Sequence, residues 1–298
     1  MSLDVAQAES ERQTERDDDR LLRRPSGVWI ENRPARRWSF RLDLQELWAY
    51  RELALALASR ELKLRYKQTV FGVAWVLLQP VLAAILFSLI FGRAIGVPSD
   101  GLPYALFAYA GLVIWTGCST GLGRAAESLT ADRSLVTKVY FPRALAPLAA
   151  LLPSALDLAI ATPLAGVLLP FYGVSGGAKL VLTPLWLVAG VAVTAGPALW
   201  LSALNVLYRD VRYALSFALQ AWLFLSPVAF PSSLVHGWAR YLFSINPLVG
   251  VIDGFRWSLL GAPAPRIADV ISLISAAVLF VTGTLYFRKV ERRFADRI

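Results

Sequence analysis

The chain has 298 residues, of which 56% are hydrophobic and only 17% charged. A single soluble domain cannot bury so large an apolar fraction, which indicates a membrane protein. The formal net charge is +9, but the basic residues gather near the ends of apolar segments and not along one exposed surface, which argues against binding to nucleic acid.

The chain begins with a polar region, residues 1–42. Up to about residue 27 it mixes charges of both signs with few apolar side chains, a composition that cannot bury enough surface to order itself. It lacks an early apolar run and a cleavage site, so no signal peptide is expected. We predict a partly disordered cytoplasmic tail.

The next region, residues 43–71, is predicted to be an amphipathic interface helix. It contains good helix formers without Pro or Gly as far as Gln68. Four basic side chains gather towards its end, namely Arg60, Lys63, Arg65 and Lys67. Apolar side chains beside a basic end suit a helix lying at a membrane surface with anionic head groups. The alternative is an ordinary packing helix of a soluble domain.

Six apolar runs then follow, each near the ~20 residues that a helix needs to cross a bilayer. The predicted spans are residues 72–91, 103–123, 145–171, 180–207, 213–230 and 270–287. Six crossings place both termini on one side of the membrane. If that side is the cytoplasm, only five of the 30 Lys and Arg residues lie outside: Arg93, Lys179, Arg240, Arg256 and Arg266. This bias predicts cytoplasmic termini, because Lys and Arg resist translocation.

A short charged segment, residues 124–143, separates the second and third predicted spans. Its positive charge places it in the cytoplasm. Residues 134–140 suit about two helical turns, which Pro142 would then stop. Two interpretations are open at this point: a tether that only fixes topology, or a docking helix that pushes against a cytoplasmic partner.

The region between the last two predicted spans, residues 231–266, is too apolar for an ordinary external loop and too interrupted for a span. We predict two short re-entrant helices that dip into the outer leaflet, with Trp and Tyr at head-group depth. Asn246 and Pro247 mark the break between them. The alternative is a plug for the outer end of the bundle.

The sequence gives no sign of chemistry performed by the chain itself. No lysine lies in a phosphate-binding Gly-x-x-x-x-Gly-Lys-Ser/Thr pattern. The single His236 supports no catalytic set, and the single Cys118 supports neither a disulfide framework nor a metal site. Energy for any work must therefore come from a partner. Asp157, an ionisable residue inside a predicted span, is either a functional group or a structural hydrogen-bonding group.

Four segments carry a resemblance to a known family: residues 60–80, 134–143, 204–213 and 245–261. In this order they resemble the permease subunits of ABC exporters for polysaccharides such as O-antigen, capsule, galactan or teichoic acid. The resemblance covers most of the chain from residue 43 onward and leaves residues 1–42 unexplained. It implies an all-α membrane protein with a transmembrane domain at residues 72–298.

The resemblance also implies roles for particular residues. The coupling helix that inserts into the ATP-hydrolysing subunit would be Ser134, Leu135, Val136, Thr137, Lys138, Val139 and Tyr140. Arg209 and Asp210 would border the cytoplasmic mouth of the channel. The periplasmic gate would include Trp238, Asn246, Pro247, Phe255 and Trp257. Sugar rings pack on flat aromatic surfaces, which makes channel-lining candidates of Phe107, Tyr109, Trp115, Trp222 and Phe224. The alternative is that they face lipid or pack the bundle, as aromatic side chains in spans more often do.

We therefore expect the transmembrane subunit of an ATP-driven exporter in the bacterial inner membrane. Two copies of this chain would form the channel for a lipid-linked polysaccharide, and two copies of an ATP-binding subunit would hold ATP and Mg²⁺. The chain itself would bind no metal or cofactor and would not be an enzyme. The alternatives are a membrane-embedded glycosyl- or acyltransferase, and an ABC exporter of a drug or small lipid.

Overall fold

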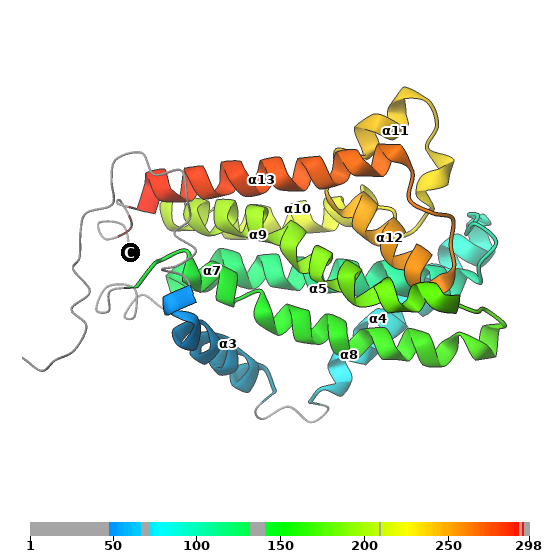
Figure 1. Ribbon diagram of the computed structural model, residues 1–298, viewed down its shortest axis with the longest axis horizontal. Coiled ribbons are helices and arrows are strands. Elements are labelled where there is room, and N and C mark those ends of the chain that lie inside the picture. Colours follow the sequence, from blue (N-terminus) through cyan, green and yellow to red (C-terminus); the bar gives the residue numbers. More distant parts are fainter. Residues whose placement is uncertain (1–47, 67–71, 132–140, 209, 292–293, 295–298) are drawn as a thin grey trace, which may run out of the picture. The chain divides into compact units, whose positions relative to one another are not determined.

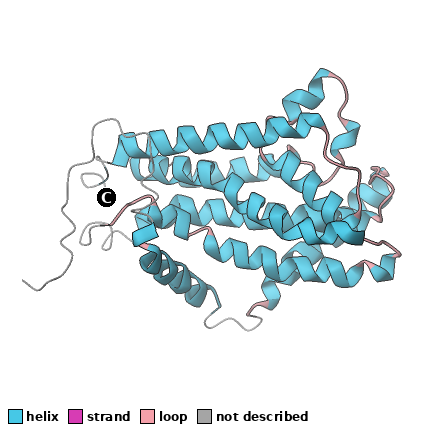
Figure 2. Ribbon diagram, in the orientation of Figure 1, coloured by secondary structure: helices cyan, strands magenta, loops and turns pink. Residues whose placement is uncertain are grey.

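A computed structural model describes residues 48–66, 72–131, 141–208, 210–291 and 294, all within the unit Arg41–Ile298. The regular structure of these residues is entirely helical (Figure 2). In chain order the helices are α3 (Arg51–Tyr66), α4 (Ala74–Phe87), η1 (Ser88–Ile95), α5 (Tyr104–Ala131), α7 (Leu145–Ala149), α8 (Leu152–Leu168), η2 (Pro170–Tyr172), η3 (Gly177–Leu182), α9 (Thr183–Leu207), α10 (Val211–Phe224), η4 (Ser232–Leu234), α11 (Trp238–Phe243), α12 (Leu248–Leu260) and α13 (Ile267–Glu291).

Five segments of the described chain are long and apolar enough to cross a membrane. They are Ala74–Ile95, Tyr104–Ala131, Leu145–Tyr172, Gly177–Leu207 and Ile267–Glu291. The chain is thus a multi-pass helical membrane protein. Five of the six predicted spans correspond to these segments, while the run 213–230 does not.

The helix within the run 213–230 is shorter than predicted. α10 contains 14 residues, or about 21 Å at 1.5 Å per residue, against ~30 Å for the hydrocarbon core of a bilayer. Turns occupy residues 225–230. Pro227 and Pro231, which lack the N–H that a continuing helix uses, lie within and just after this turn. Hydropathy alone did not reveal that the helix ends at Phe224.

α5 is the central helix of the bundle. It packs against α4, α8, α9 and α12 (Figure 1), and most of its side chains are buried. Gly117 permits close contact with α8, because a Cβ atom there would lie 2.6 Å from a methyl carbon of Leu158. α5 also extends to Ala131, so the first part of the predicted charged loop 124–143 is helical.

The described bundle has two ends that matter for function. At one end, here called the loop end, lie Ala131, Phe141 and Glu291, together with α3 (Figure 1). At the other, here called the α12 end, lie α11, α12 and the start of α13 (Figure 1). The long helices α5, α9 and α13 run between these ends.

Candidate functional site

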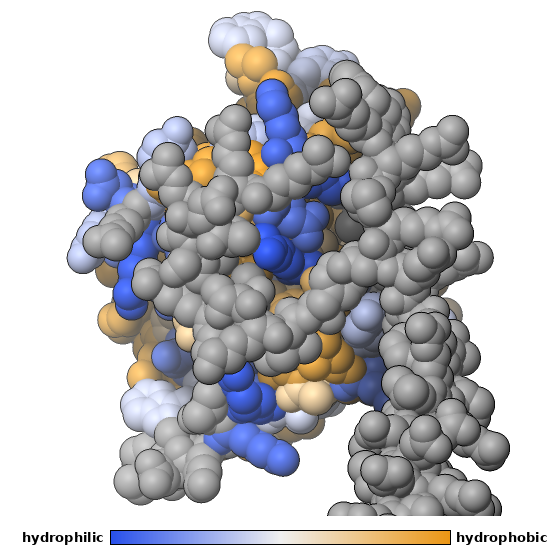
Figure 3. Space-filling view, turned by 90° about the vertical axis from the view of Figure 1, so that its left-hand side faces the viewer, coloured by the Kyte–Doolittle hydropathy of each residue, from blue (hydrophilic) through white to orange (hydrophobic). Residues whose placement is uncertain are grey.

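The loop end surrounds the segment predicted to dock on a partner. Ser134–Tyr140 themselves lie outside the described residues, as does Lys67. Their downstream flank is fixed: Phe141 is buried with Leu145, Phe287 and Phe294 in one apolar cluster. Figure 3 views this end and shows hydrophilic side chains among hydrophobic ones. The chain that follows the predicted coupling helix is therefore anchored to the bundle.

Two hydrogen bonds join Arg143 to Glu291 at this end. The backbone N–H of Arg143 donates to Oε1 of Glu291 at 3.3 Å, and its guanidinium donates to the backbone carbonyl of Glu291 at 2.8 Å. Glu291 closes α13, so the second bond satisfies a carbonyl at a helix C-terminus, where a cation is favoured. Two hydrogen bonds, both donated by Arg143, tie the loop flank to the last turn of α13.

α3 presents two different faces at the loop end. Ala58 is buried, and Leu53 and Ala54 pack against the cluster that contains Phe141. Trp48 and Leu55 are 70% and 61% exposed and point away from the bundle. Within the predicted interface helix 43–71 the structure describes α3, whereas residues 43–47 and 67–71 lie outside the described residues. Its basic side chains divide: Arg60 lies 3.6 Å from Glu61, Lys63 is exposed, and the side chain of Arg65 is outside the described part.

The start of α10 also lies at the loop end. Arg212 forms an ion pair with Glu127 of α5 at 2.8 Å. Asp210, predicted at the cytoplasmic mouth, is exposed and precedes α10 directly, whereas Arg209 is not described. A cleft of about 110 Å³ lies nearby between α3, α5 and α7, lined by Leu57, Glu61, Arg124, Glu127, Ser128, Ala131, Ala146 and Ala150.

Of the intramembrane candidates, Asp157, Phe107 and Tyr109 are enclosed by the helices of this chain. Asp157 lies in α8 and is 7% exposed. Phe107 and Tyr109 are 1% and 2% exposed, and the Tyr109 hydroxyl donates to the carbonyl of Ala161 at 2.8 Å. The arrangement makes Phe107 and Tyr109 packing residues within this chain, and their role towards cargo stays a prediction.

The remaining aromatic candidates lie on α5 and α10. Trp115 meets Trp222 edge to face, with ring centroids 5.9 Å apart. Trp222 donates its indole N–H to Oδ1 of Asn246 at 2.9 Å. Phe224, at the end of α10, is 58% exposed. These residues therefore form a series from the buried core of the bundle to an exposed surface of α10.

Asn246 joins α10 to the α11–α12 turn. Besides accepting from Trp222, its Oδ1 accepts from the N–H of Leu248 at 3.0 Å, a side-chain turn that supplies an acceptor to the first residue of α12. Its amide donates to the carbonyl of Leu225 and to Oγ of Ser226. The break that the sequence places at Asn246 and Pro247 is thus a junction whose polar atoms are paired. Pro247 is the residue that precedes α12 and is buried.

The other predicted gate residues are spread over the α12 end. Phe255 is fully buried on α12, while Trp238 at the start of α11 is 76% exposed. Trp257 is half-buried, and Nζ of Lys179 lies 5.2 Å from its ring centroid, a cation–π contact. Phe255 thus belongs to the core, and Trp238 and Trp257 belong to the surface. No observation on these residues tests a gating role, which remains a prediction.

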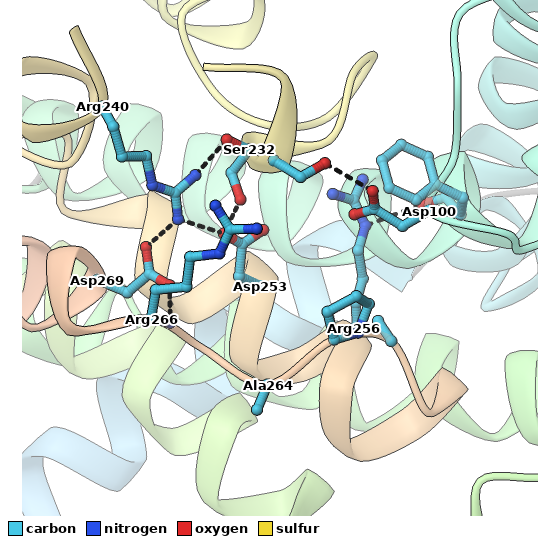
Figure 4. A pocket seen from close by; sticks show the side chains of 12 residues that line it. Asp100, Ser232, Arg240, Asp253, Arg256, Ala264, Arg266 and Asp269 are labelled. Atoms are coloured by element: carbon cyan, nitrogen blue, oxygen red, sulfur yellow. Dashed lines mark hydrogen bonds and ion pairs between the residues drawn. The ribbon is translucent and has the colours of Figure 1, made fainter. Parts of the chain in front are cut away.

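A buried ionic cluster, missed by sequence reasoning, connects α11, α12 and α13. Arg240, 5% exposed, pairs through Nη2 with Asp269 and, at 3.4 Å, with Asp253. Its Nη1 donates to the carbonyl of Ser232, whose hydroxyl donates to Asp253 (Figure 4). A pocket of about 30 Å³ adjoins the cluster, room for little more than water.

Burial governs the electrostatics of this cluster. It raises the pKa of the Asp253 carboxyl, and the hydrogen bond from Ser232 and the charges of Arg256 and Arg240 offset this only in part. Burial also lowers the pKa of Arg256 to about 10, so that its guanidinium remains charged at neutral pH. The sequence signal for this cluster was charged residues recurring inside the apolar stretch 231–266.

Within the described residues no three His, Cys, Asp or Glu side chains are placed to share a metal ion. The features with chemical character are instead the Arg143–Glu291 link at the loop end and an ionic cluster at the α12 end, joined by helices long enough to cross a bilayer. They define a multi-pass membrane protein whose two ends are each tied together by polar contacts.

The chain belongs to the ABC-2 type transporter family, whose profile matches residues 52–260. It is 27% identical over 258 residues to an O-antigen export system permease protein of Myxococcus xanthus, covering 86% of this chain and 98% of that protein. It is 25% identical over 246 residues to an O-antigen export system permease protein of Klebsiella pneumoniae, covering 82% and 94%. These findings confirm the family resemblance that the four sequence segments indicated.

Proposed function

We propose that this chain is the transmembrane subunit of an ATP-driven exporter that moves a lipid-linked polysaccharide across the bacterial inner membrane. The observation that carries the proposal is similarity to O-antigen export permeases along nearly their whole length. Family membership supports pairing with an ATP-binding subunit, which would hold ATP and Mg²⁺. The chain then contributes the path for the cargo and no catalytic group.

We propose six crossings, with α10 and the turn after it as the fifth. α10 begins at the loop end, where Arg212 pairs with Glu127. It finishes at the α12 end, where Trp222 binds Asn246. Six crossings give both termini on one side, and the excess of Lys and Arg then favours the cytoplasm. The α12 end faces the periplasm in this arrangement.

A second copy of the chain is proposed to complete the channel. α10 supports this, because the described part of the chain buries only Leu215 along its length. Tyr213 and Phe217 are 78% and 75% exposed on it. An apolar helix exposed to this degree is covered either by lipid or by another helix. A partner copy on α10 would place Phe224 at the shared surface, where sugar rings could stack on aromatic faces.

The loop end is the proposed site of ATPase docking. Residues 134–140 lie between Ala131 and the anchored Phe141, and α3 lies at the same end with Lys63 exposed. Two copies of the ATP-binding subunit would press on the two loops of the dimer. α11 and α12, at the far end, would form the periplasmic gate, and opening of one end against the other would pass the glycan outward.

The proposal is tested by reconstituting the chain with its ATP-binding subunit in vesicles and following transport of lipid-linked O-polysaccharide. ATP-dependent transport that requires both subunits is expected. Modification of the glycan by this chain without the ATPase would instead favour a membrane-embedded transferase. ATP-dependent transport of a small lipid or drug, with no transport of glycan, would favour the other exporter class.

A further inference from the structure

α13 is held at its C-terminal end by the flank of the docking segment. Glu291 is bonded to both the backbone and the guanidinium of Arg143. One turn earlier, Phe287 is buried at 1% exposure and packs in the same cluster as Phe141. Any displacement of Arg143 must therefore either break these contacts or move the end of α13.

The opposite end of the same helix is bound to α11 and α12. Asp269, 4% exposed, pairs with Arg240 of α11. Ser272 accepts the backbone N–H of Gly250 of α12 at 3.0 Å. The first turn is itself fixed, since Asp269 accepts the N–H of Arg266 at 2.7 Å. Because the Arg240–Asp269 pair is buried and ionic, separating it would leave uncompensated charges.

Between its ends α13 crosses α9 in backbone contact. A Cβ atom on Gly283 would lie 2.5 Å from the carbonyl oxygen of Gly196, and one on Gly196 would lie 2.5 Å from the N atom of Phe280. Trp200 and Tyr286 stack beside the crossing, with centroids 4.2 Å apart. Many other side chains of α13, such as Ile274 and Val281, are exposed. α9 is therefore the main lateral support of α13 along its length (Figure 1).

We propose that α13 is a lever that pivots at Gly196 and Gly283 and carries movement of Arg143 to α11 and α12, an inference that rests on the proposed function. The arm from Gly283 to Glu291 is about 12 Å long and the arm to Asp269 about 21 Å. A tilt at the loop end is thus enlarged about 1.8-fold at the α12 end, with opposite direction. Glu291 and Asp269 are the positioning residues through which this lever acts.

The test uses the reconstituted complex and a cysteine at the α12 end. In an Ala264→Cys chain, reaction with a membrane-impermeant maleimide reports on the exposed link between α12 and α13 (Figure 4). Cys118 is buried, so the chain without Ala264→Cys serves as the background. ATP should change the labelling rate. Adding Arg143→Ala together with Glu291→Ala removes both hydrogen bonds between these residues. The double substitution should abolish that change and lower the glycan exported per ATP about tenfold, while ATP hydrolysis continues.

Two control variants separate the lever from a general loss of structure. Glu291→Gln keeps an oxygen that accepts the N–H of Arg143, and should retain both the labelling change and export. Lys289→Ala removes an exposed side chain from the same last turn. This variant should likewise retain the labelling change and export. Should the chain with Arg143→Ala and Glu291→Ala fail to accumulate, Asp269→Ala replaces it, since it removes the acceptor of Arg240 and of the N–H of Arg266. It should uncouple in the same way.

The possible outcomes distinguish failure of the lever from failure of the proposed function. Wild-type export per ATP in the complex with Arg143→Ala and Glu291→Ala, or an ATP-dependent labelling change that survives this double substitution, overturns the lever while leaving the proposed function intact. A wild-type complex that hydrolyses ATP but exports no glycan overturns the proposed function, and the lever falls with it.

Discussion

The guanidinium carbon of Arg256 lies 3.5 Å from the centre of the Phe107 ring, and both side chains are at most 2% exposed. The same guanidinium donates to the carbonyls of Phe107, Pro227 and Val228. One side chain of α12 thus holds the start of α5 and the turn after α10. The carbonyls of Pro227 and Val228 lie in the turn after α10, where no helical N–H follows to bond them, and this side chain supplies their donors.

Replacing Arg256 should therefore destabilise the α12 end strongly. Arg256→Ala leaves three buried carbonyls without this donor, and we expect a loss of about 3–5 kcal/mol in the free energy of unfolding. Arg256→Lys should rescue only part of it, because an ammonium cannot reproduce the planar fork. The measurement is denaturant unfolding of the purified chain in detergent micelles. Arg212→Lys, at an exposed ion pair, should cost less than about 1 kcal/mol; equal losses for the two lysine variants would contradict this account.

The crossing of α9 and α13 gives a second prediction. Gly283→Ala places a methyl group against the backbone of Gly196 and should cost about 1–3 kcal/mol through overpacking. Gly166→Ala is the matched control, because nothing lies within 4 Å of a Cβ atom at that position of α8. Thermal unfolding of the two variants in the same detergent should give a lowered Tm for the first alone. A normal Tm for Gly283→Ala would mean that the helices separate without cost.

The buried carboxyl of Asp253 predicts a pH dependence. Burial raises its pKa above 3.8 in the folded chain, so the folded state binds this proton more tightly than the unfolded state. The resulting stabilisation is fully present below pH 3.8 and is lost as the pH rises through the raised pKa. Relative to Asp253→Asn, the wild-type Tm should fall as the pH is raised from 3.8 towards neutral. Parallel Tm curves for the two chains would refute this assignment.

The predicted docking segment, residues 134–140, can be tested by introducing negatively charged side chains. Val136→Glu together with Tyr140→Glu should weaken contact with the ATP-binding subunit, since burying unpaired carboxylates in an interface is unfavourable. Export should fall about tenfold or more, with ATP hydrolysis by the partner no longer stimulated by glycan. Copurification of the two subunits measures the loss of contact directly. Undiminished export would assign residues 134–140 to a simple tether.

Hydropathy predicted five of the candidate spans but not the turn that ends α10. The apolar runs 72–91 and 270–287 correspond to the candidate spans Ala74–Ile95 and Ile267–Glu291, because twenty apolar residues in a row are a local property of the chain. The prediction of one continuous helix over residues 213–230 is wrong. Its helix ends at Phe224, where the carbonyls of Pro227 and Val228 bind Arg256. That contact joins residues far apart in sequence and leaves no local hydropathy signal.

The sequence by itself determined that this protein is a multi-pass helical membrane protein, and it predicts which side of the membrane its basic segments face. Those properties depend on the length of apolar runs and on the distribution of Lys and Arg, which are readable residue by residue. Only the tertiary structure decided that Arg240 meets Asp253 and Asp269, and that Arg143 meets Glu291. Partners so far apart in the chain are selected by helix packing, because a buried charge is stable only where the fold brings it a counter-charge.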